Sequence, residues 1–202
     1  MRAKNLSILF AALFVIAGAA LATGARAEGE VPAPPAIGAT IEDFTLPDVD
    51  NKDRSLKSLA GKNGTVLIFI SVQCPVSNAY NERMEKLAED YKAKGIAVVG
   101  INSNVAEDAA AVKAHAAEHK LSFPILKDPG NKIANKLGAS VTPEAYFIDQ
   151  NNKLLYHGRI DNSRNAAQVE SNDLRNALDS ALAGKAIEKS ETKGFGCSIK
   201  RA

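Results

Sequence analysis

Two patterns of apolar and polar positions along the chain predict its strands and its helices. Continuous apolar runs rich in β-branched residues are typical of short strands that are covered on both faces. Such runs occupy residues 65–70, 96–101 and 145–149. Residues 122–126 give a shorter strand, and residues 153–157 return as a hairpin partner after the turn at 150–152.

Other segments repeat apolar residues every three to four positions, which predicts helices with one buried face. The clearest of them follows Pro75 and is closed by Gly95. Its apolar positions are Tyr80, Met84, Leu87 and Tyr91. Further helices are predicted over residues 107–120, 131–137 and 173–183.

The elements follow the order β-α-β-α-β, then a hairpin and a helix. This alternation predicts an α/β fold in which a mostly parallel sheet is flanked by helices, with antiparallel strands added at one side. Residues 37–185 are long enough to bury a sizeable core as one domain. Residues 28–36 read as a flexible leader, and residues 186–202 read as a polar, extended tail that carries Cys197.

The first 27 residues have the pattern of a secretory signal peptide. Arg2 and Lys4 precede an apolar run at residues 6–21, and residues 25–27 read Ala-Arg-Ala. The run is short for a membrane span, so we expect cleavage after Ala27 rather than an uncleaved anchor. The mature protein is then periplasmic or secreted, with no stable membrane span.

The charge and the cysteine content exclude two classes of protein, nucleic-acid-binding proteins and disulfide scaffolds. The whole chain has a formal charge of +2, but residues 28–202 hold 22 basic and 23 acidic side chains, a charge of −1. No basic surface remains that would favour a nucleic-acid partner. Cys74 and Cys197 are the two cysteines, too few for a disulfide scaffold but enough for one redox pair in an oxidising compartment.

Cys74 lies at the junction between a predicted buried strand and a predicted helix. Pro75 suits the first helical position, where its missing N–H costs nothing. The free amides and the dipole at such a helix start favour an anion, and the thiolate is the form of cysteine that attacks disulfides and peroxides. The alternative is that Cys74 is a small buried apolar residue.

A second signal is Pro143, which directly precedes the predicted strand at residues 145–149. Proline fits the first residue of a strand better than its interior. The peptide bond between Thr142 and Pro143 is therefore a candidate for the cis form.

Five stretches together carry a family resemblance. They are DFTLP at residues 43–47, CPV and NAY within 74–80, TPE and FID within 142–149, GRID at 158–161, and TK and GCSIK within 192–200. In order and spacing they resemble the thioredoxin-fold alkyl hydroperoxide reductase/thiol-specific antioxidant family, and within it an exported peroxiredoxin-like group. The resemblance implies a thioredoxin-like fold with Cys74 as the redox-active sulfur. It also implies that Thr142 and Pro143 form a cis-proline loop facing Cys74. We take Pro75, Thr142, Pro143 and Arg159 as candidates for the substrate surface.

The chain also departs from the family pattern. Many relatives carry Cys-x-x-Cys where this chain has Ser-Val-Gln-Cys at residues 71–74, so a dithiol cycle within the motif is impossible. Ser71 instead fits the Thr/Ser position of the peroxiredoxin motif and is a candidate donor of a hydrogen bond to the sulfur. Peroxiredoxins place an arginine where this chain has Pro143, and Arg159 is the candidate substitute.

Cys197 stands in the segment Gly-Phe-Gly-Cys-Ser-Ile, whose glycines suggest a mobile approach to another sulfur. Three alternatives remain open: Cys197 resolves an oxidised Cys74, forms a permanent disulfide with it, or stays a free thiol. His115 and His119 have a spacing that can hold a metal, but no acidic or sulfur ligand accompanies them. We predict a solvated face there, and neither a metal nor another cofactor.

These signals favour an exported thiol–disulfide oxidoreductase in which Cys74 is the nucleophile and Cys197 or an external thiol resolves the intermediate. Its substrates would be thiols, disulfides or peroxides, and an external thiol would supply electrons. One alternative is a thiol peroxidase acting on hydroperoxides. The other is a non-catalytic binding or structural module in which Cys74 and Cys197 form a permanent disulfide.

Overall fold

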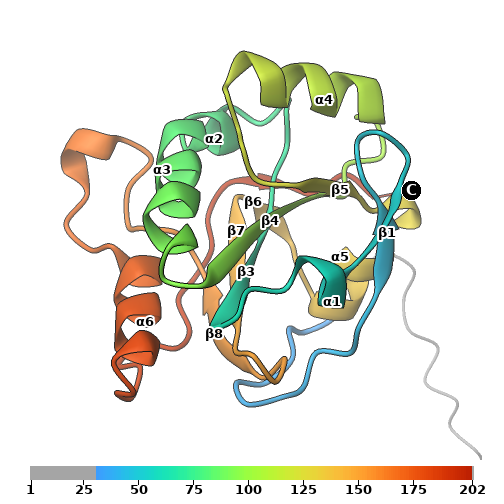
Figure 1. Ribbon diagram of the computed structural model, residues 1–202. Coiled ribbons are helices and arrows are strands. Elements are labelled where there is room, and N and C mark those ends of the chain that lie inside the picture. The colour runs from blue at the N-terminus through green and yellow to red at the C-terminus, as the bar shows by residue number, and fades with distance from the viewer. Residues whose placement is uncertain (1–30, 202) are drawn as a thin grey trace, which may run out of the picture. The chain divides into compact units, whose positions relative to one another are not determined.

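The computed structural model describes residues 31–201 (Figure 1). The predicted signal peptide, residues 1–27, and the first residues of the predicted leader, 28–30, lie outside this range. Between residues 31 and 201 no helix is long and apolar enough to cross a membrane.

Five strands form a central mixed sheet in the order β5-β4-β3-β7-β8 (Figure 1). They are β3 Gly64–Phe69, β4 Ile96–Asn102, β5 Ile125–Lys127, β7 Glu144–Ile148 and β8 Leu154–Gly158. Strands β3, β4 and β5 run parallel, whereas β7 runs antiparallel to β3 and to β8. The predicted α/β fold, with a mixed sheet and a closing hairpin, is confirmed.

Alternating side chains of the central strand β3 point to opposite faces of the sheet, and both faces are covered. Val66 and Ile68 belong to one apolar cluster, while Leu67 and Phe69 belong to the other. All four side chains are fully buried. This explains why the strand reads as a continuous apolar run rather than as an alternating one.

Helices cover the two faces of the sheet (Figure 1). Apolar residues of α3 (Asn81–Lys92) and α6 (Asp173–Leu182) pack on the first face, and residues of α1 (Leu56–Leu59) and α5 (Lys132–Leu137) pack on the second. The remaining helices are α2 Pro75–Asn78, α4 Ala109–Glu118 and the 3-10 turns η1 Pro129–Asn131 and η2 Ala166–Gln168.

Two short antiparallel pairs lie outside the central sheet. They are β1 (Thr45–Pro47) with β2 (Asp53–Ser55), and β6 (Val141–Thr142) with β9 (Cys197–Ser198). The second pair brings the C-terminal segment onto the loop that precedes β7. Ile199 is 5% exposed and joins the second apolar cluster, so the tail contributes to the core.

The structure corrects the predicted start of α4. The helix begins at Ala109, because the side chain of Asp108 caps it by accepting a hydrogen bond from the backbone N–H of Ala111 over 2.7 Å. Glu107, which the sequence placed inside the helix, is 2% exposed and points into the protein. The loop before α4 therefore presents an acid to the carboxyl end of the sheet.

The histidine prediction is wrong for one of the two residues. His115 is 8% exposed, and its Nε2 lies 3.1 Å from Nδ2 of Asn81 on α3. His119 is exposed. Helix α4 thus packs with His115 facing inward, and only His119 lies on a solvated face.

Parallel strands β3 and β4 end at the same edge of the sheet. Residues 71–74 leave the edge after β3, and residues 103–107 leave it after β4. Segments that are about 30 residues apart in sequence therefore meet there, as expected for the carboxyl ends of neighbouring parallel strands. Both cysteines lie at this edge.

Candidate active site

The turn after β3 places Cys74 at the start of a short helix. Cys74 is the N-cap of α2 and Pro75 is the first helical residue, as predicted. The helix ends at Asn78, so only one turn stands where the sequence predicted the start of the long helix. Sγ of Cys74 accepts a hydrogen bond from the backbone N–H of Ser77 over 3.3 Å. This amide favours the thiolate form of Cys74.

The loop before β7 faces the sulfur. The peptide bond between Thr142 and Pro143 is cis. Sγ of Cys74 lies 3.3 Å from the carbonyl oxygen of Thr142, a distance over which a protonated thiol donates to that oxygen. Cys74 is 3% exposed, Thr142 is 1% exposed and Pro143 is buried. The structure thus brings together three of the residues that the sequence singled out.

Cys197 reaches the same loop on strand β9. It stands directly opposite Thr142 in the β6–β9 pair, and Oγ1 of Thr142 donates a hydrogen bond to the carbonyl oxygen of Cys197 over 3.5 Å. Cys197 is partly exposed, whereas Cys74 is buried, and both are free thiols in the structure. The residue before the cis-proline therefore contacts both cysteines.

The glycines that flank Phe195 let the tail approach the cis-proline loop closely. A Cβ at Gly196 would overlap the carbonyl group of Thr142, and one at Gly194 would come within 3.1 Å of the Val141 side chain. Between them, the ring of Phe195 packs edge-on against Tyr80, with ring centroids 6.3 Å apart. The sequence suggested mobility for this segment, and the structure gives the glycines a packing role instead.

The two thiols have opposite electrostatic environments. Burial by itself raises the pKa of Cys74, but hydrogen bonds from the Cys197 thiol and from the Ser77 backbone more than offset it, so the pKa lies below its ordinary value. The same contact with Cys74, together with burial, raises the pKa of Cys197. The contact between the two thiols therefore favours the thiolate form of Cys74 over that of Cys197.

A cavity of about 260 Å³ opens beside the two cysteines. It is lined by Ser71, Gln73, Cys74, Asn104, Ala106, Glu107, Cys197, Ser198 and Lys200. Its walls come from the turn after β3, the loop after β4 and the tail. A small reactant in this cavity would meet both thiols.

Comparison with known proteins agrees with this geometry. Residues 37–157 match the AhpC/TSA family. The chain belongs to the AhpC/TSA family. The match spans the sheet, Cys74 and the cis-proline loop, and it ends before Cys197, so the tail lies outside the family match.

Named relatives of this AhpC/TSA protein include two kinds of redox protein. The chain is 30% identical over 119 residues to the thiol-disulfide oxidoreductase ResA of Bacillus thuringiensis, covering 59% of this chain and 67% of the relative. It is 33% identical over 101 residues to the chloroplastic peroxiredoxin Q of Triticum aestivum, covering 50% of this chain and 45% of the relative. These similarities support thiol–disulfide oxidoreductase or peroxiredoxin-like chemistry.

A solved structure extends the likeness to more of the chain. A hypothetical protein from Sinorhizobium meliloti 1021 is 34% identical to this AhpC/TSA protein, with a TM-score of 0.78. The likeness covers 83% of this chain and 96% of that protein. Together with the strand order and the cis-proline, it supports the thioredoxin-like architecture expected from the sequence.

Ser71 has a different role from the one expected. Its hydroxyl donates to Oε1 of Glu107 over 2.6 Å and accepts the backbone N–H of Cys74 over 3.1 Å. Its single proton is directed at Glu107, so it does not donate to the sulfur. In this AhpC/TSA protein Ser71 instead anchors the backbone of the cysteine turn.

Arg159 is not brought to the cysteines. Its Nε forms an ion pair with Oδ2 of the buried Asp173 over 2.7 Å, and Arg159 does not line the cavity beside Cys74. The cation among the lining residues is Lys200, on the tail. Arg159 therefore does not take the place of the arginine that peroxiredoxins carry at the position of Pro143.

Glu107 is a site residue that the sequence analysis missed. It contacts the turn before Cys74 and lines the cavity with both thiols. The available signal was its position in the loop after the second parallel strand, because such loops meet at the carboxyl edge of the sheet. Among residues 31–201, no group of three or more His, Cys, Asp or Glu side chains is arranged to hold a metal ion.

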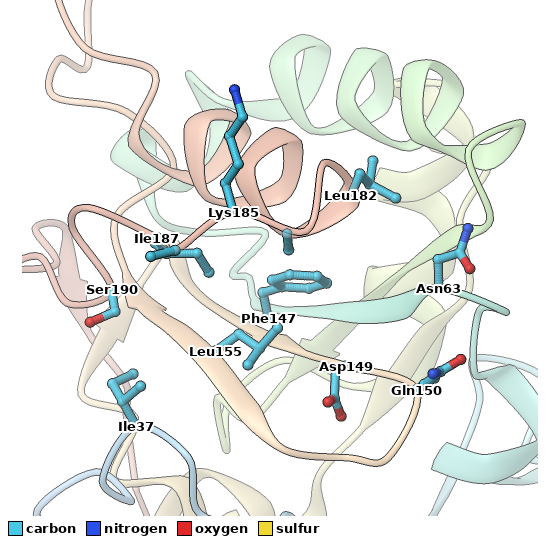
Figure 2. A pocket seen from close by; sticks show the side chains of 12 residues that line it. Ile37, Asn63, Phe147, Asp149, Gln150, Leu155, Leu182, Lys185, Ile187 and Ser190 are labelled. Carbon is cyan, nitrogen blue, oxygen red and sulfur yellow. The ribbon is translucent and has the colours of Figure 1, made fainter.

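A larger hollow of about 620 Å³ lies away from the cysteines (Figure 2). Phe147, Leu155 and Leu182 form part of its wall, and Asp149 and Lys185 lie among its other lining residues. None of the residues that line it also lines the cavity beside Cys74. The larger hollow therefore does not contain the two cysteines.

The lowered pKa of Cys74 predicts its reactivity profile. Alkylation of Cys74 by iodoacetamide, followed by peptide mass spectrometry, is expected to rise with pH around a midpoint below the ~8.5 of an ordinary cysteine. The sign follows from the shift, because a lowered pKa populates the thiolate at lower pH. In Cys197→Ala the midpoint moves up, since a hydrogen-bond donor is lost. A midpoint at or above that of free cysteine in the wild type contradicts this prediction.

Proposed function

We propose that the protein is a thiol–disulfide oxidoreductase in which Cys74 is the nucleophile and Cys197 is the resolving thiol. One observation carries the proposal: Cys197 stands opposite Thr142 in the β6–β9 pair, and the Thr142 carbonyl oxygen lies 3.3 Å from Sγ of Cys74. A resolving sulfur thus lies next to an attacking sulfur whose pKa is lowered. The similarity of the chain to the thiol-disulfide oxidoreductase ResA supports this class of reaction.

In the first step the Cys74 thiolate attacks one sulfur of a substrate disulfide. A bond forms between Cys74 and that sulfur, and the other substrate sulfur leaves as a thiolate that takes up a proton. The Ser77 amide stabilises the attacking anion before the reaction. Thr142 contacts the sulfur, and Pro75 and Pro143 are the next residues after Cys74 and Thr142; the three would shape the surface that the substrate meets.

In the second step Cys197 releases the first product. Cys197 loses its proton and attacks Cys74, a disulfide forms between Cys74 and Cys197, and the second substrate sulfur leaves as a thiol. The substrate has gained two electrons and two protons, and the protein has lost them. An external dithiol then returns both thiols of the protein to the reduced state.

Thiol counting tests this proposal. The full-length reduced protein is mixed with one equivalent of oxidised glutathione, quenched with a maleimide under denaturing conditions and weighed intact. We expect both thiols to disappear together, without a retained glutathione adduct, and to return after treatment with a dithiol. Loss of a single thiol, with a glutathione adduct that stays on the protein, would contradict the resolving role of Cys197. A bond that dithiols do not reduce would instead support a structural disulfide.

A thiol peroxidase is the second candidate function. The likeness to peroxiredoxin Q and the small cavity beside Cys74 favour it. Cys74 thiolate would attack a peroxide oxygen, giving a sulfenic acid and a hydroxide ion that takes up a proton to form water. The Cys197 thiol would then condense with the sulfenic acid to a disulfide, releasing a second water. Fast, stoichiometric oxidation by hydrogen peroxide would favour this reaction, and slow oxidation beside fast exchange with disulfides would favour the first.

We infer that the protein works after export. The signal-peptide pattern in residues 1–27 supports this, and reversible exchange between thiols and a disulfide suits an oxidising compartment. The intact mass of protein recovered from the producing cell checks it. A chain that starts at Glu28 supports export, and a chain that retains residues 1–27 contradicts cleavage.

A further inference from the structure

One buried carboxylate holds the whole turn that leads into Cys74. Glu107 accepts hydrogen bonds from Oγ of Ser71 over 2.6 Å, from the backbone N–H of Val72 over 3.0 Å and from that of Gln73 over 3.1 Å. These three residues are consecutive in the chain, and the next residue is Cys74. A single side chain from another loop thus fixes the path of the segment before the nucleophile.

The connection continues to the backbone of Cys74 itself. Ser71, while it donates to Glu107, accepts the backbone N–H of Cys74 over 3.1 Å. Burial alone raises the pKa of Glu107, but the hydrogen bonds from Ser71, from Asn102 and from the turn lower it below its ordinary value. Glu107 is therefore an anion near neutral pH, and hydrogen bonds to an anion are stronger than those to a neutral oxygen.

The same carboxylate is linked to the tail that carries Cys197. Nδ2 of Asn104 donates to Oε1 of Glu107 over 3.3 Å, and Oδ1 of Asn104 accepts the backbone N–H of Lys200 over 2.7 Å. The backbone N–H of Val105 also donates to the carbonyl oxygen of Lys200 over 3.1 Å. Lys200 follows Cys197 by three residues, so this loop ties down the end of strand β9.

We propose that Glu107 is a positioning residue that holds the Cys74 turn and the Cys197 tail together, so that their two sulfurs can form a disulfide. The inference rests on the proposed function, because it assumes that Cys74 and Cys197 exchange. Glu107 acts through the turn and through Asn104 and takes no part in bond making.

The physical basis is the narrow geometry of a disulfide. The two Cβ atoms must approach to about 4 Å with a restricted dihedral angle, so small shifts of either backbone weaken the bond. Cys74 and Cys197 are far apart in sequence, and their segments meet only through contacts at the edge of the sheet. A carboxylate that binds the turn directly and the tail through Asn104 raises the effective concentration of one thiol at the other.

The test compares disulfide equilibria of the full-length protein in glutathione buffers. As the Cys74–Cys197 bond forms, one glutathione disulfide is reduced to two glutathione thiols, which receive the two protons of the protein thiols. Glu107→Gln keeps the size of the side chain but replaces one acceptor oxygen with a donor, which leaves an amide of the turn unpaired. We expect the equilibrium constant to fall about tenfold, the loss of roughly one hydrogen bond to a charged group.

A matched control separates positioning from general stability. Asp128 is also 2% exposed, and it accepts hydrogen bonds from Oγ of Ser103 and from the backbone N–H groups of Ile133 and Ala134. It contacts neither cysteine segment through its side chain. Asp128→Asn is expected to lower resistance to denaturant while it leaves the glutathione equilibrium within about twofold of the wild type.

The outcomes are separable. If the wild type forms no intramolecular disulfide, the proposed function fails. If the wild type forms it and folded Glu107→Gln has the same equilibrium constant, only the positioning role is overturned. Should Glu107→Gln not fold, Asn104→Ala decides. It removes the hydrogen bonds of Asn104 with Glu107 and with the backbone N–H of Lys200, and we expect the equilibrium constant to fall by at least about threefold. An unchanged constant in Asn104→Ala overturns the inference in that case.

Discussion

A Cys74→Ser variant is expected to lose thiol–disulfide exchange by at least about 1,000-fold. A serine hydroxyl is almost wholly protonated near neutral pH and is a poor nucleophile toward sulfur, so neither the mixed disulfide nor the Cys74–Cys197 bond forms. The hydroxyl still fits the position, because it can accept the Ser77 amide and donate to the Thr142 carbonyl oxygen. Turnover with oxidised glutathione and an external dithiol measures the loss, and circular dichroism checks the fold.

Cys197→Ser is the matched control for this variant. It keeps the attacking sulfur of Cys74 and removes the resolving one. We expect it to form a mixed disulfide with glutathione that persists, visible in the intact mass as one adduct. A Cys74→Ser protein with wild-type turnover would falsify the assignment of the nucleophile, and turnover that survives in Cys197→Ser through added thiol would assign resolution to an external thiol.

Gly196→Ala is expected to weaken the Cys74–Cys197 disulfide about 100-fold in its equilibrium with glutathione. The backbone of Gly196 approaches the Thr142 carbonyl group so closely that even a methyl group overlaps it. The tail must move away from the cis-proline loop, and a displacement of about 1 Å between reacting groups is enough for an effect of this size. The glutathione titration described for Glu107→Gln measures the equilibrium constant of this disulfide.

Gly184→Ala controls for the backbone strain in this substitution. Gly184 also has a positive φ, +66°, but an added Cβ meets nothing within 4 Å. We expect a loss of about 1 kcal/mol in the free energy of unfolding and no change in the disulfide equilibrium. If Gly196→Ala behaves in the same way, the close approach of the tail does not set the distance between the sulfurs.

The pattern of the chain was sufficient for the five strands of the central sheet and for helices α3, α5 and α6, because local causes decide them, but it did not predict α1 or the short strands β1, β2, β6 and β9. The apolar run of β3 needs burial on both faces, and Pro75 can occupy only the first turn of a helix. Cys74 could therefore be placed at a helix start without knowledge of the tertiary structure. Where the prediction of α4 failed, Asp108 caps the helix, and hydrogen bonds from Ser71 and Val72 hold Glu107 outside it.

The sequence by itself determined the α/β order of the elements, the position of Cys74 at the start of a helix and the proline that opens β7. Only the tertiary structure decided what surrounds that sulfur. It pairs Cys197 with Thr142, turns Ser71 toward Glu107 and binds Arg159 to Asp173. These contacts join segments that are from 14 to 55 residues apart, and the pattern of either segment carries no information on its partner. The contact between Ser71 and Glu107 arises because the parallel strands β3 and β4 end at a common edge. The other two depend on the close backbone approach of β9 to β6 and on the pairing of the buried Asp173.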